Sequence, residues 1–272
     1  MGNRNSLPTV PCPVDAAFYD VTYFLGECEG YQEFITYGGR TLSNRLATAL
    51  RYADVRPGMR VLDIGCGRGE VLVWLRRQGA EAWGLDYAPD ALRLTITTLA
   101  GADPGQTQSN VRVLAANARH LPFYPESFDH VLMLDIVEHL HPWELDLALR
   151  EVWRVLKWDG KLLVHTAPNR WYYQFGYPLF RTFERLRGIS LPKDPRQRFR
   201  SHQYVHVNEQ SPRSLARSLQ QAGFQPQIWL ADTQRRWADQ GRLTYMLGWL
   251  VTHCPPCTWI FCGDILGVAH KV

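Results

Sequence analysis

The sequence predicts an α/β protein in which helices cover both faces of a mostly parallel sheet. Short, branched apolar segments alternate with longer segments whose apolar residues recur at helical spacing. The stretch from Val61 to Glu70 begins this pattern with a buried strand, three glycines and an apolar-periodic helix. Strand, glycine turn and helix together open a Rossmann-like unit. At 272 residues, the chain can form one large domain with additional segments.

The overall composition is ordinary for a globular protein. Apolar residues make up 46% and charged residues 21% of the chain, and 30 basic against 26 acidic residues give a net charge of +4. This charge is too small to indicate nucleic-acid binding by the whole molecule. The first ten residues lack the apolar core of a signal peptide, and no apolar run reaches the length of about 18 residues that a spanning helix needs. We therefore expect a cytoplasmic protein.

The elements of the first half are predicted by apolar spacing and by their end signals. Leucines and alanines at helical spacing predict a helix over 41–53, and a buried strand over 61–64 follows a Pro-Gly turn. The next helix opens at Glu70 and ends at Gly79, because glycine commonly terminates a helix. The following elements are, in order, a strand over 82–86, a helix beginning near Pro89, a polar loop over 101–110 and a strand over 111–115.

The second half contains the predicted central strand. Residues 128–134 are almost continuously apolar, as expected of a parallel strand buried on both faces. A long helix begins at Pro142, and Ser211 with Pro212 is a strong helix start. The remaining elements are a turn over 157–160, a strand over 161–165, a strand over 227–231 and a last strand over 259–269.

Asp63 makes the glycine loop more specific. It stands two residues before the first glycine, where a carboxylate would be unfavourable beside a pyrophosphate but suits a ligand with an ammonium group. Gly65, Gly67 and Gly69 follow the spacing Gly-x-Gly-x-Gly instead of the Gly-x-Gly-x-x-Gly of dinucleotide sites. These features disfavour a nucleotide-dependent oxidoreductase and favour S-adenosylmethionine. The stretch resembles motif I of the class I methyltransferases.

A second block strengthens this resemblance. Residues 117–169 contain Leu-Pro-Phe, Phe-Asp, Glu-His-Leu, a helix with Arg-Val-Leu-Lys and a Pro-Asn after the next strand. The chain is similar to ubiquinone-biosynthesis O-methyltransferases and to methyltransferase type 11 domains, firmly over about 45–170 and loosely over 206–270. The resemblance implies a seven-stranded sheet of order 3-2-1-4-5-7-6 with the last strand antiparallel, and S-adenosyl-L-methionine as co-substrate.

The predicted cofactor residues follow the strand ends. Asp86 ends the second strand 21 residues after Gly65, where one carboxylate can bind both hydroxyls of a ribose. The resemblance places Arg45 at the carboxylate of the cofactor's methionine, and Asn117 where the family usually has an acid that binds the adenine amino group. The other residues expected to line the site are Cys66, Tyr87, Ala118 and Leu134.

His139 is the best candidate for a catalytic base, because it follows the fourth strand at the ligand edge of the sheet. The alternative role of His139 is to fix the cofactor pocket. His202 and His206 come second, and His165 and the pair Tyr172-Tyr173 are also placed near the cleft.

The run Asp135-x-x-Glu138-His139 resembles a Glu-x-x-Glu-His run that binds a divalent cation in some methyltransferases. The Glu-His pair is also widespread in metal-free relatives, so we expect no metal.

We interpret residues 1–272 as a single methyltransferase domain with added segments. Its parts are an irregular N-terminal arm over 1–40, a cofactor-binding half over 41–169, a cap insertion over 170–205, and a C-terminal half over 206–272 with a second insertion at about 232–256. The favoured function is transfer of a methyl group to a small and partly apolar acceptor. Oxygen is the favoured acceptor atom. The alternatives are a nucleic-acid methyltransferase that uses the basic segment 181–200, which we do not expect, and an oxidoreductase.

The two insertions allow two interpretations. Their aromatic, basic and apolar helical residues can pack together as a lid over the cleft, which is favoured, or make peripheral contact with an anionic membrane. The oligomeric state is left open by the sequence.

Overall fold

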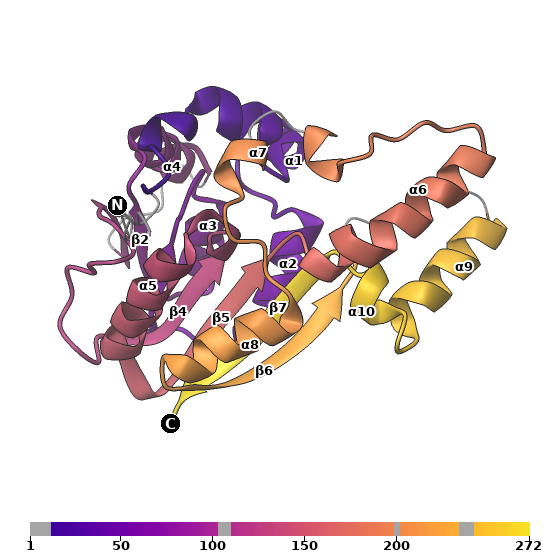
Figure 1. The fold of residues 1–272 in the computed structure, drawn as a ribbon. Helices are drawn as coiled ribbons and strands as arrows, with labels where there is room; N and C mark the ends of the chain where they lie inside the picture. The colour runs from indigo at the N-terminus through magenta and orange to yellow at the C-terminus, as the bar shows by residue number, and fades with distance from the viewer. Residues whose placement is uncertain (1–11, 103–109, 199–201, 234–241) are drawn as a thin grey trace, which may run out of the picture.

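The computed structural model describes residues 12–102, 110–198, 202–233 and 242–272. A seven-stranded sheet runs through the molecule, and helices lie on both of its faces (Figure 1). Within these residues, no helix has the length and apolar character needed to cross a membrane.

The sheet has the predicted strand order, 3-2-1-4-5-7-6. Strands β1 to β5 pair in parallel, and β7 is antiparallel to both of its neighbours, β5 and β6. The strands are β1 (Arg60–Ile64), β2 (Glu81–Asp86), β3 (Val111–Ala115), β4 (Phe128–Leu134), β5 (Leu156–Thr166), β6 (Phe224–Ala231) and β7 (Asp264–Lys271).

The helices connect the strands and form the additional segments. They are α1 (Tyr31–Tyr37), α2 (Asn44–Leu50), α3 (Glu70–Arg77), α4 (Pro89–Ala102), α5 (Pro142–Val155), α6 (Tyr177–Leu186), α7 (His202–Val205), α8 (Pro212–Gln221), α9 (Arg242–His253) and α10 (Thr258–Phe261). Short 3₁₀ and π segments include η1 (Ala16–Phe18), η2 (Tyr23–Glu27), η4 (Val137–His139), η5 (Tyr172–Gly176) and η6 (Pro195–Arg198).

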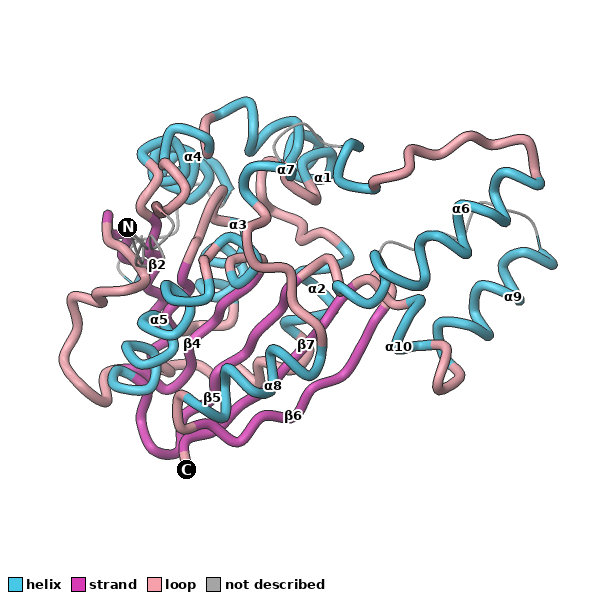
Figure 2. The backbone as a smooth tube through the Cα atoms, viewed as in Figure 1, coloured by secondary structure: helices cyan, strands magenta, loops and turns pink. Residues whose placement is uncertain are grey.

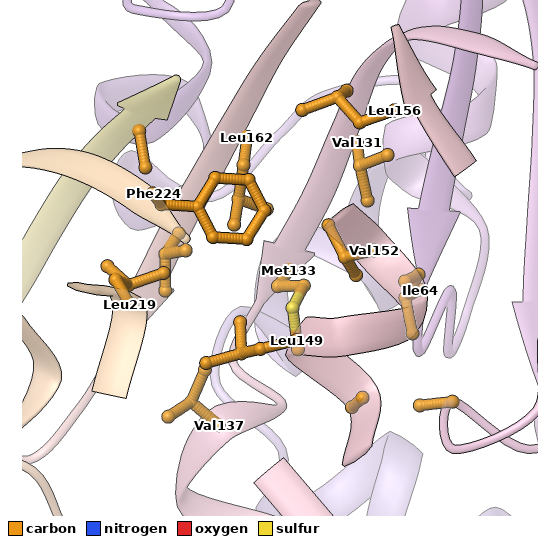
Figure 3. Packing of buried hydrophobic residues seen from close by; sticks show 14 of the residues in the cluster. Ile64, Val131, Met133, Val137, Leu149, Val152, Leu156, Leu162, Leu219 and Phe224 are labelled. Atoms are coloured by element: carbon orange, nitrogen blue, oxygen red, sulfur yellow. The ribbon is translucent and has the colours of Figure 1, made fainter. Parts of the chain in front are cut away.

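Alternate residues of each central strand supply two hydrophobic cores, one on each face of the sheet. In β4, Val131 and Met133 pack with α5 and α8, while Leu132 and Leu134 belong to the core shared with α2, α3 and α4. Figure 3 shows the first core, where Leu149 and Val152 of α5 lie close to Met133. The helices on both faces confirm the doubly wound arrangement.

Several predicted boundaries are wrong. Residues 258–261 form α10, so the last strand begins at Asp264 instead of Trp259. The expected turn over 157–160 lies within β5, where the register with β4 shifts: Leu156 pairs with Phe128, and the next pair is Lys161 with His130. The helix predicted over 41–53 is shorter, because the Ser43 side chain caps it and α2 starts at Asn44. The N-terminal arm, expected to be irregular, contains η1, η2 and α1.

The two insertions pack together through α10 and η5. A Cβ atom added to Gly176 would overlap with the backbone of Ile260, so only glycine permits this approach. The rings of Trp171 and Trp259 lie 5.4 Å apart, and the Asn169 amide donates to the Trp259 carbonyl oxygen at 3.0 Å. Helices α6 and α9 extend away from the sheet on the same side of the view (Figure 2). We call residues 170–197 and 246–262 the outer lobe.

Candidate active site

A cleft lies at the carboxyl ends of the parallel strands, where open α/β sheets bind ligands. It is lined by the glycine loop after β1, by the ends of β2, β3 and β4, and by the N-terminal arm, which contributes Tyr19, Tyr23 and Phe24. These three side chains pack with Val205 of α7. The arm therefore forms one wall of the cleft.

No described residue of the outer lobe lines this cleft. The expectation that the insertion over 170–205 and the second insertion together form a lid is therefore wrong for the part of the chain that the structure describes. Only the end of the first insertion approaches the cleft, through Val205. Tyr172 and Tyr173, predicted near the cleft, pack instead with Tyr177 in the outer lobe.

The glycine loop is held by its backbone conformation and by contacts with the N-terminal arm and α4. Gly65, Gly67 and Gly69 have positive φ angles of 76°, 51° and 87°, which L side chains rarely adopt. A Cβ atom at Gly67 would also lie 3.4 Å from the Phe24 ring. Thr95 donates a hydrogen bond to the Gly67 carbonyl oxygen at 2.8 Å, so α4 fixes the loop from behind.

Asp63 presents a buried carboxyl group to the cleft. Only 2% of the residue is exposed, it lines the cleft, and its Oδ2 has no hydrogen-bond partner. Burial, with the nearby carboxylates of Glu70 and Asp86, raises the pKa of Asp63 to about 8. An unpartnered buried carboxyl oxygen is costly, and a cationic ligand would remove that cost.

Asp86 and Asn117 follow β2 and β3 and also line the cleft. Asp86 accepts hydrogen bonds from the backbone N–H of Gly67 at 3.0 Å and of Ala88 at 2.9 Å. The Asn117 amide oxygen accepts from the Arg119 backbone N–H and from Arg119 Nε, both at 3.0 Å. The proposed bond from adenine to this oxygen would therefore have to displace Arg119, and the adenine role of Asn117 stays a prediction.

Of the other predicted cofactor residues, four line the cleft and Gly69 does not. Cys66, Tyr87, Ala118 and Leu134 all line the cleft. Gly69 lies behind it, where a Cβ atom would approach Thr95 at 3.0 Å. Their contacts with a cofactor stay predictions.

Arg45 belongs to a buried charge network and not to the cleft lining. Its guanidinium lies 3.0 Å from Asp135, 3.5 Å from Glu29 and 3.8 Å from Asp264. A cofactor carboxylate would therefore compete with three carboxylates of the chain. The predicted contact of Arg45 with the methionine carboxylate stays a prediction.

His165 completes this network between two acids. Its Nδ1 donates to Asp135 Oδ1 at 2.6 Å and its Nε2 donates to Asp264 Oδ1 at 3.2 Å. Burial favours the neutral ring, but the two carboxylates outweigh it and raise the pKa of His165 to about 10. Burial likewise opposes ionisation of Asp135, yet Arg45 and His165 hold its pKa well below the usual value. His165 is thus an imidazolium with both nitrogens engaged, which makes it unsuitable as a base.

His139 lines the cleft and is oriented by two neighbours. Its Nδ1 lies 3.2 Å from the Val205 carbonyl oxygen and 3.1 Å from Tyr19 Oη. A carbonyl oxygen can only accept, so Nδ1 carries the proton and Nε2 of the neutral ring keeps its lone pair. His206 stacks edge-on against the same ring at 4.9 Å. The side chain of His202 lies outside the described residues.

Among the described residues, the side chains that could hold a metal differ from the Asp135, Glu138 and His139 run that resembles a cation site. Ligand atoms of Glu138, His139 and His206 lie within 4.8 Å of one another. Asp135 is instead bound to Arg45 and His165. The Glu138 carboxylate already accepts from Thr166 Oγ1 at 2.7 Å, and burial with nearby Asp135 raises its pKa to about 7.

Comparison with known proteins identifies the domain. A family model described as a methyltransferase domain matches residues 62–164, which include the glycine loop, Asp86 and His139. Residues 62–164 therefore carry a methyltransferase domain.

Two relatives match beyond this domain. The demethylmenaquinone methyltransferase of Thermobifida fusca is 28% identical over 65% of this chain and 73% of its own length. The ubiquinone biosynthesis O-methyltransferase of Azorhizobium caulinodans is 30% identical over 63% of this chain and 62% of its own length. Methyltransferase GfsG of Streptomyces halstedii is 31% identical, but this chain spans only 38% of it.

Solved structures agree on the fold. A Haemonchus contortus phosphoethanolamine N-methyltransferase 2, in complex with S-adenosyl-L-methionine, has a TM-score of 0.58 at 17% identity and covers 91% of this chain and 59% of its own. A Pyrococcus horikoshii protein, PH0226, has a TM-score of 0.56 at 20% identity over 95% of this chain and 99% of its own.

The residues of the methyltransferase domain fit S-adenosylmethionine, its co-substrate. The glycine loop leaves room at Gly67, and the unpartnered oxygen of Asp63 matches the positive charge of an ammonium group. Asp63, Asp86 and the glycine loop would hold it, while the chemistry that it supplies is a methyl group on a positively charged sulfur.

Sequence reasoning missed Tyr19 and Arg68 of the cleft and Asp264 of the buried charge network. Tyr19 was one aromatic residue among many in the arm. Arg68 lies inside the glycine motif, and it donates to the arm at the Phe24 and Glu29 carbonyl oxygens, at 3.0 and 2.7 Å, while pairing with Glu70. Its position between the glycines was the available signal. Asp264 had no signal, because its partner His165 is 99 residues away.

Proposed function

We propose that the protein transfers a methyl group from S-adenosylmethionine to an oxygen atom of a small, partly apolar acceptor. The observation that supports oxygen as the acceptor atom is the orientation of His139. Its Nδ1–H is held by the Val205 carbonyl oxygen, which assigns the basic lone pair of the neutral ring to Nε2. A hydroxyl must lose a proton on methylation, and a positioned histidine is the usual acceptor.

The proposed step balances as follows. The acceptor oxygen forms a bond to the methyl carbon while the bond from that carbon to sulfur breaks, and the sulfur leaves as a neutral thioether. The hydroxyl proton passes to His139 Nε2 and then to solvent. The chain's part is to hold the hydroxyl in line and to exclude water, which places the two reactants at a high effective concentration.

Tyr19 acts as a positioning residue for His139. Its hydroxyl is nearly buried, and burial together with contact with Tyr87 raises its pKa far above the usual value, so it stays protonated. Tyr87 in turn donates to the Val14 carbonyl oxygen at 3.1 Å. The arm thereby fixes the histidine ring against rotation.

The apolar part of the acceptor is supported by the walls of the cleft. Near His139, the lining consists of Tyr19, Tyr23, Ile136 and Leu140. Such walls favour an aromatic ring or a hydrocarbon chain beside the reacting hydroxyl. The names of the ubiquinone and demethylmenaquinone methyltransferases point to acceptors of this kind.

The test measures formation of S-adenosylhomocysteine with phenols that carry alkyl chains of increasing length. Each phenol is paired with its own methyl ether, which keeps the ring and the alkyl chain but has no hydroxyl, and with the corresponding aniline. Turnover of phenols alone supports the proposal. Turnover of anilines with silent phenols would refute the assignment to oxygen and leave methyl transfer intact.

A further inference from the structure

The outer lobe carries an unusual share of the exposed apolar side chains. Among the described residues, 20 large hydrophobic side chains are exposed, and eight of them lie in this lobe, which is less than a fifth of the chain. They are Phe175, Leu179, Leu186, Ile189, Met246, Trp249, Leu250 and Trp259. Leu186 is 84% exposed. Such a concentration indicates a surface that contacts something apolar.

These side chains lie on defined helix faces. On η5 and α6, Phe175, Leu179 and Leu186 share a helical spacing, while Tyr177 and Phe180 point into the lobe and pack with Tyr172. On α9, Met246, Trp249 and Leu250 are exposed, whereas Thr252 is buried. The outer faces are therefore apolar although the lobe has its own core.

The positive charge of the molecule is concentrated in the same lobe. Its sequence contains six arginines and lysines and two acids, a formal charge of +4, which equals that of the whole chain. Two of the arginines are paired with acids: Arg187 with buried Glu184 at 2.9 Å, and Arg196 with Glu209, which lies outside the lobe, at 2.6 Å. Arg185 and Lys193 are exposed.

We propose that the outer lobe docks on a lipid surface that carries anionic headgroups. Exposed leucines and tryptophans would enter the boundary between headgroups and acyl chains, and the arginines and lysines would contact the headgroup phosphates. Charge complementarity favours an anionic lipid surface over a second copy of this chain, because two copies would place two lobes of +4 against each other. This inference does not depend on the methylated atom.

The lobe is attached to the sheet at the end of β5. Its Trp259 and Cys262 carbonyl oxygens both accept from the Asn169 amide, at 3.0 and 3.1 Å, directly after β5. None of the described lobe residues lines the cleft, so docking would leave the cleft accessible.

The experiment measures flotation of the whole protein with vesicles of phosphatidylcholine alone and of phosphatidylcholine with phosphatidylglycerol. Two apolar variants are tested, Leu179→Gln with Leu186→Gln on α6, and Trp249→Gln with Leu250→Gln on α9. Arg185→Gln tests the charge. The matched controls are Ile96→Gln, which is 59% exposed on α4, and Arg150→Gln, whose side chain is 68% exposed on α5.

We expect binding to the anionic vesicles only. Arg185→Gln should lower the partition coefficient about fivefold, as expected for one basic residue near such a surface. Loss of binding in either apolar variant, with both controls unchanged, supports the proposal and assigns the contact to that helix. Binding to neither vesicle, equal binding to both, or retained binding in both apolar variants overturns it. A dimer in light scattering that Leu186→Gln dissociates, without vesicle binding, would assign the surface to a second copy instead.

Discussion

Tyr19 Oη lies 3.1 Å from Nδ1 of His139, although the two residues are 120 positions apart. The contact joins the N-terminal arm to a residue that follows β4, so the proposed base is oriented by a segment outside residues 62–164, which match the methyltransferase domain. The wall of the cleft that the arm forms is therefore in direct contact with the proposed catalytic base.

The first prediction concerns the base. His139→Gln should lower turnover by roughly 10²–10⁴ while the affinity for S-adenosylhomocysteine stays within about twofold. Tyr19→Phe keeps the ring and removes the hydroxyl, so it should lower turnover by roughly 2–10-fold, the scale of one hydrogen bond. Steady-state kinetics and calorimetric titration measure both. Tyr37→Phe, exposed on α1, is the control. A matching loss of cofactor affinity in His139→Gln would assign the histidine to the cofactor pocket.

The second prediction concerns Asp63. With a pKa of about 8 in the free protein, its carboxyl group is mostly protonated at neutral pH, and it must ionise to pair with an ammonium group. Cofactor binding should therefore release close to one proton, seen in calorimetry as a dependence of the binding enthalpy on the buffer's ionisation enthalpy. Asp63→Asn should abolish this dependence and weaken binding. An unchanged proton release in Asp63→Asn would contradict the assignment.

The third prediction concerns the ribose site and the loop. Asp86→Ala should weaken S-adenosylhomocysteine binding by roughly 1–3 kcal/mol, the cost of hydrogen bonds to a charged group. Gly67→Val should abolish binding, because its side chain would approach Phe24 from a backbone with φ of 51°. Asp146→Ala, a surface aspartate of α5, is the control. Normal affinity in Asp86→Ala would exclude the ribose role.

The fourth prediction concerns pH and the buried network. The pKa of His165 is raised to about 10, from about 6.5 in an unfolded chain. A raised pKa gives stability that is complete below about pH 6.5 and is lost as the pH rises towards about 10. The free energy of unfolding of the wild type should fall over that range. His165→Gln should be less stable at neutral pH by about 3–5 kcal/mol, as when one partner of a buried ion pair is removed.

The control for this prediction is the shape of the pH profile. In denaturant titrations, His165→Gln should show a shallower alkaline decline than the wild type. Parallel profiles would mean that His165 is not held as an imidazolium between Asp135 and Asp264.

The fifth prediction concerns metal. Activity should be unchanged after treatment with EDTA, since Thr166 already donates to the Glu138 carboxylate and Val205 orients His139. Activity that EDTA removes and Mg²⁺ or Mn²⁺ restores would assign a cation to Glu138, His139 and His206.

The sequence predicted what depends on local pattern. Gly65, Gly67 and Asp86 stand at fixed distances from strand ends, and the strand order came with the family resemblance. Contacts between distant segments carried no such signal, so the Tyr19 contact with His139 and the role of Asp264 were not predicted. The prediction of a lid was wrong for a related reason. Apolar and basic residues in 170–205 indicate that these side chains are buried or contact a partner, but they do not identify the surface that they contact.

The position of β7 bears on how the chain folds as it is synthesised. Of the seven strands, β7 is made last, yet it lies between β5 and β6 and pairs with both. Until it emerges, β5 remains an open edge with unpaired backbone groups, and β6 has no partner. The half of the sheet that carries the glycine loop can assemble early from neighbouring segments, whereas the acid that clamps His165 arrives only with β7. A nascent chain would therefore have a formed glycine loop and its neighbouring strands before the charge network beneath the cleft is complete.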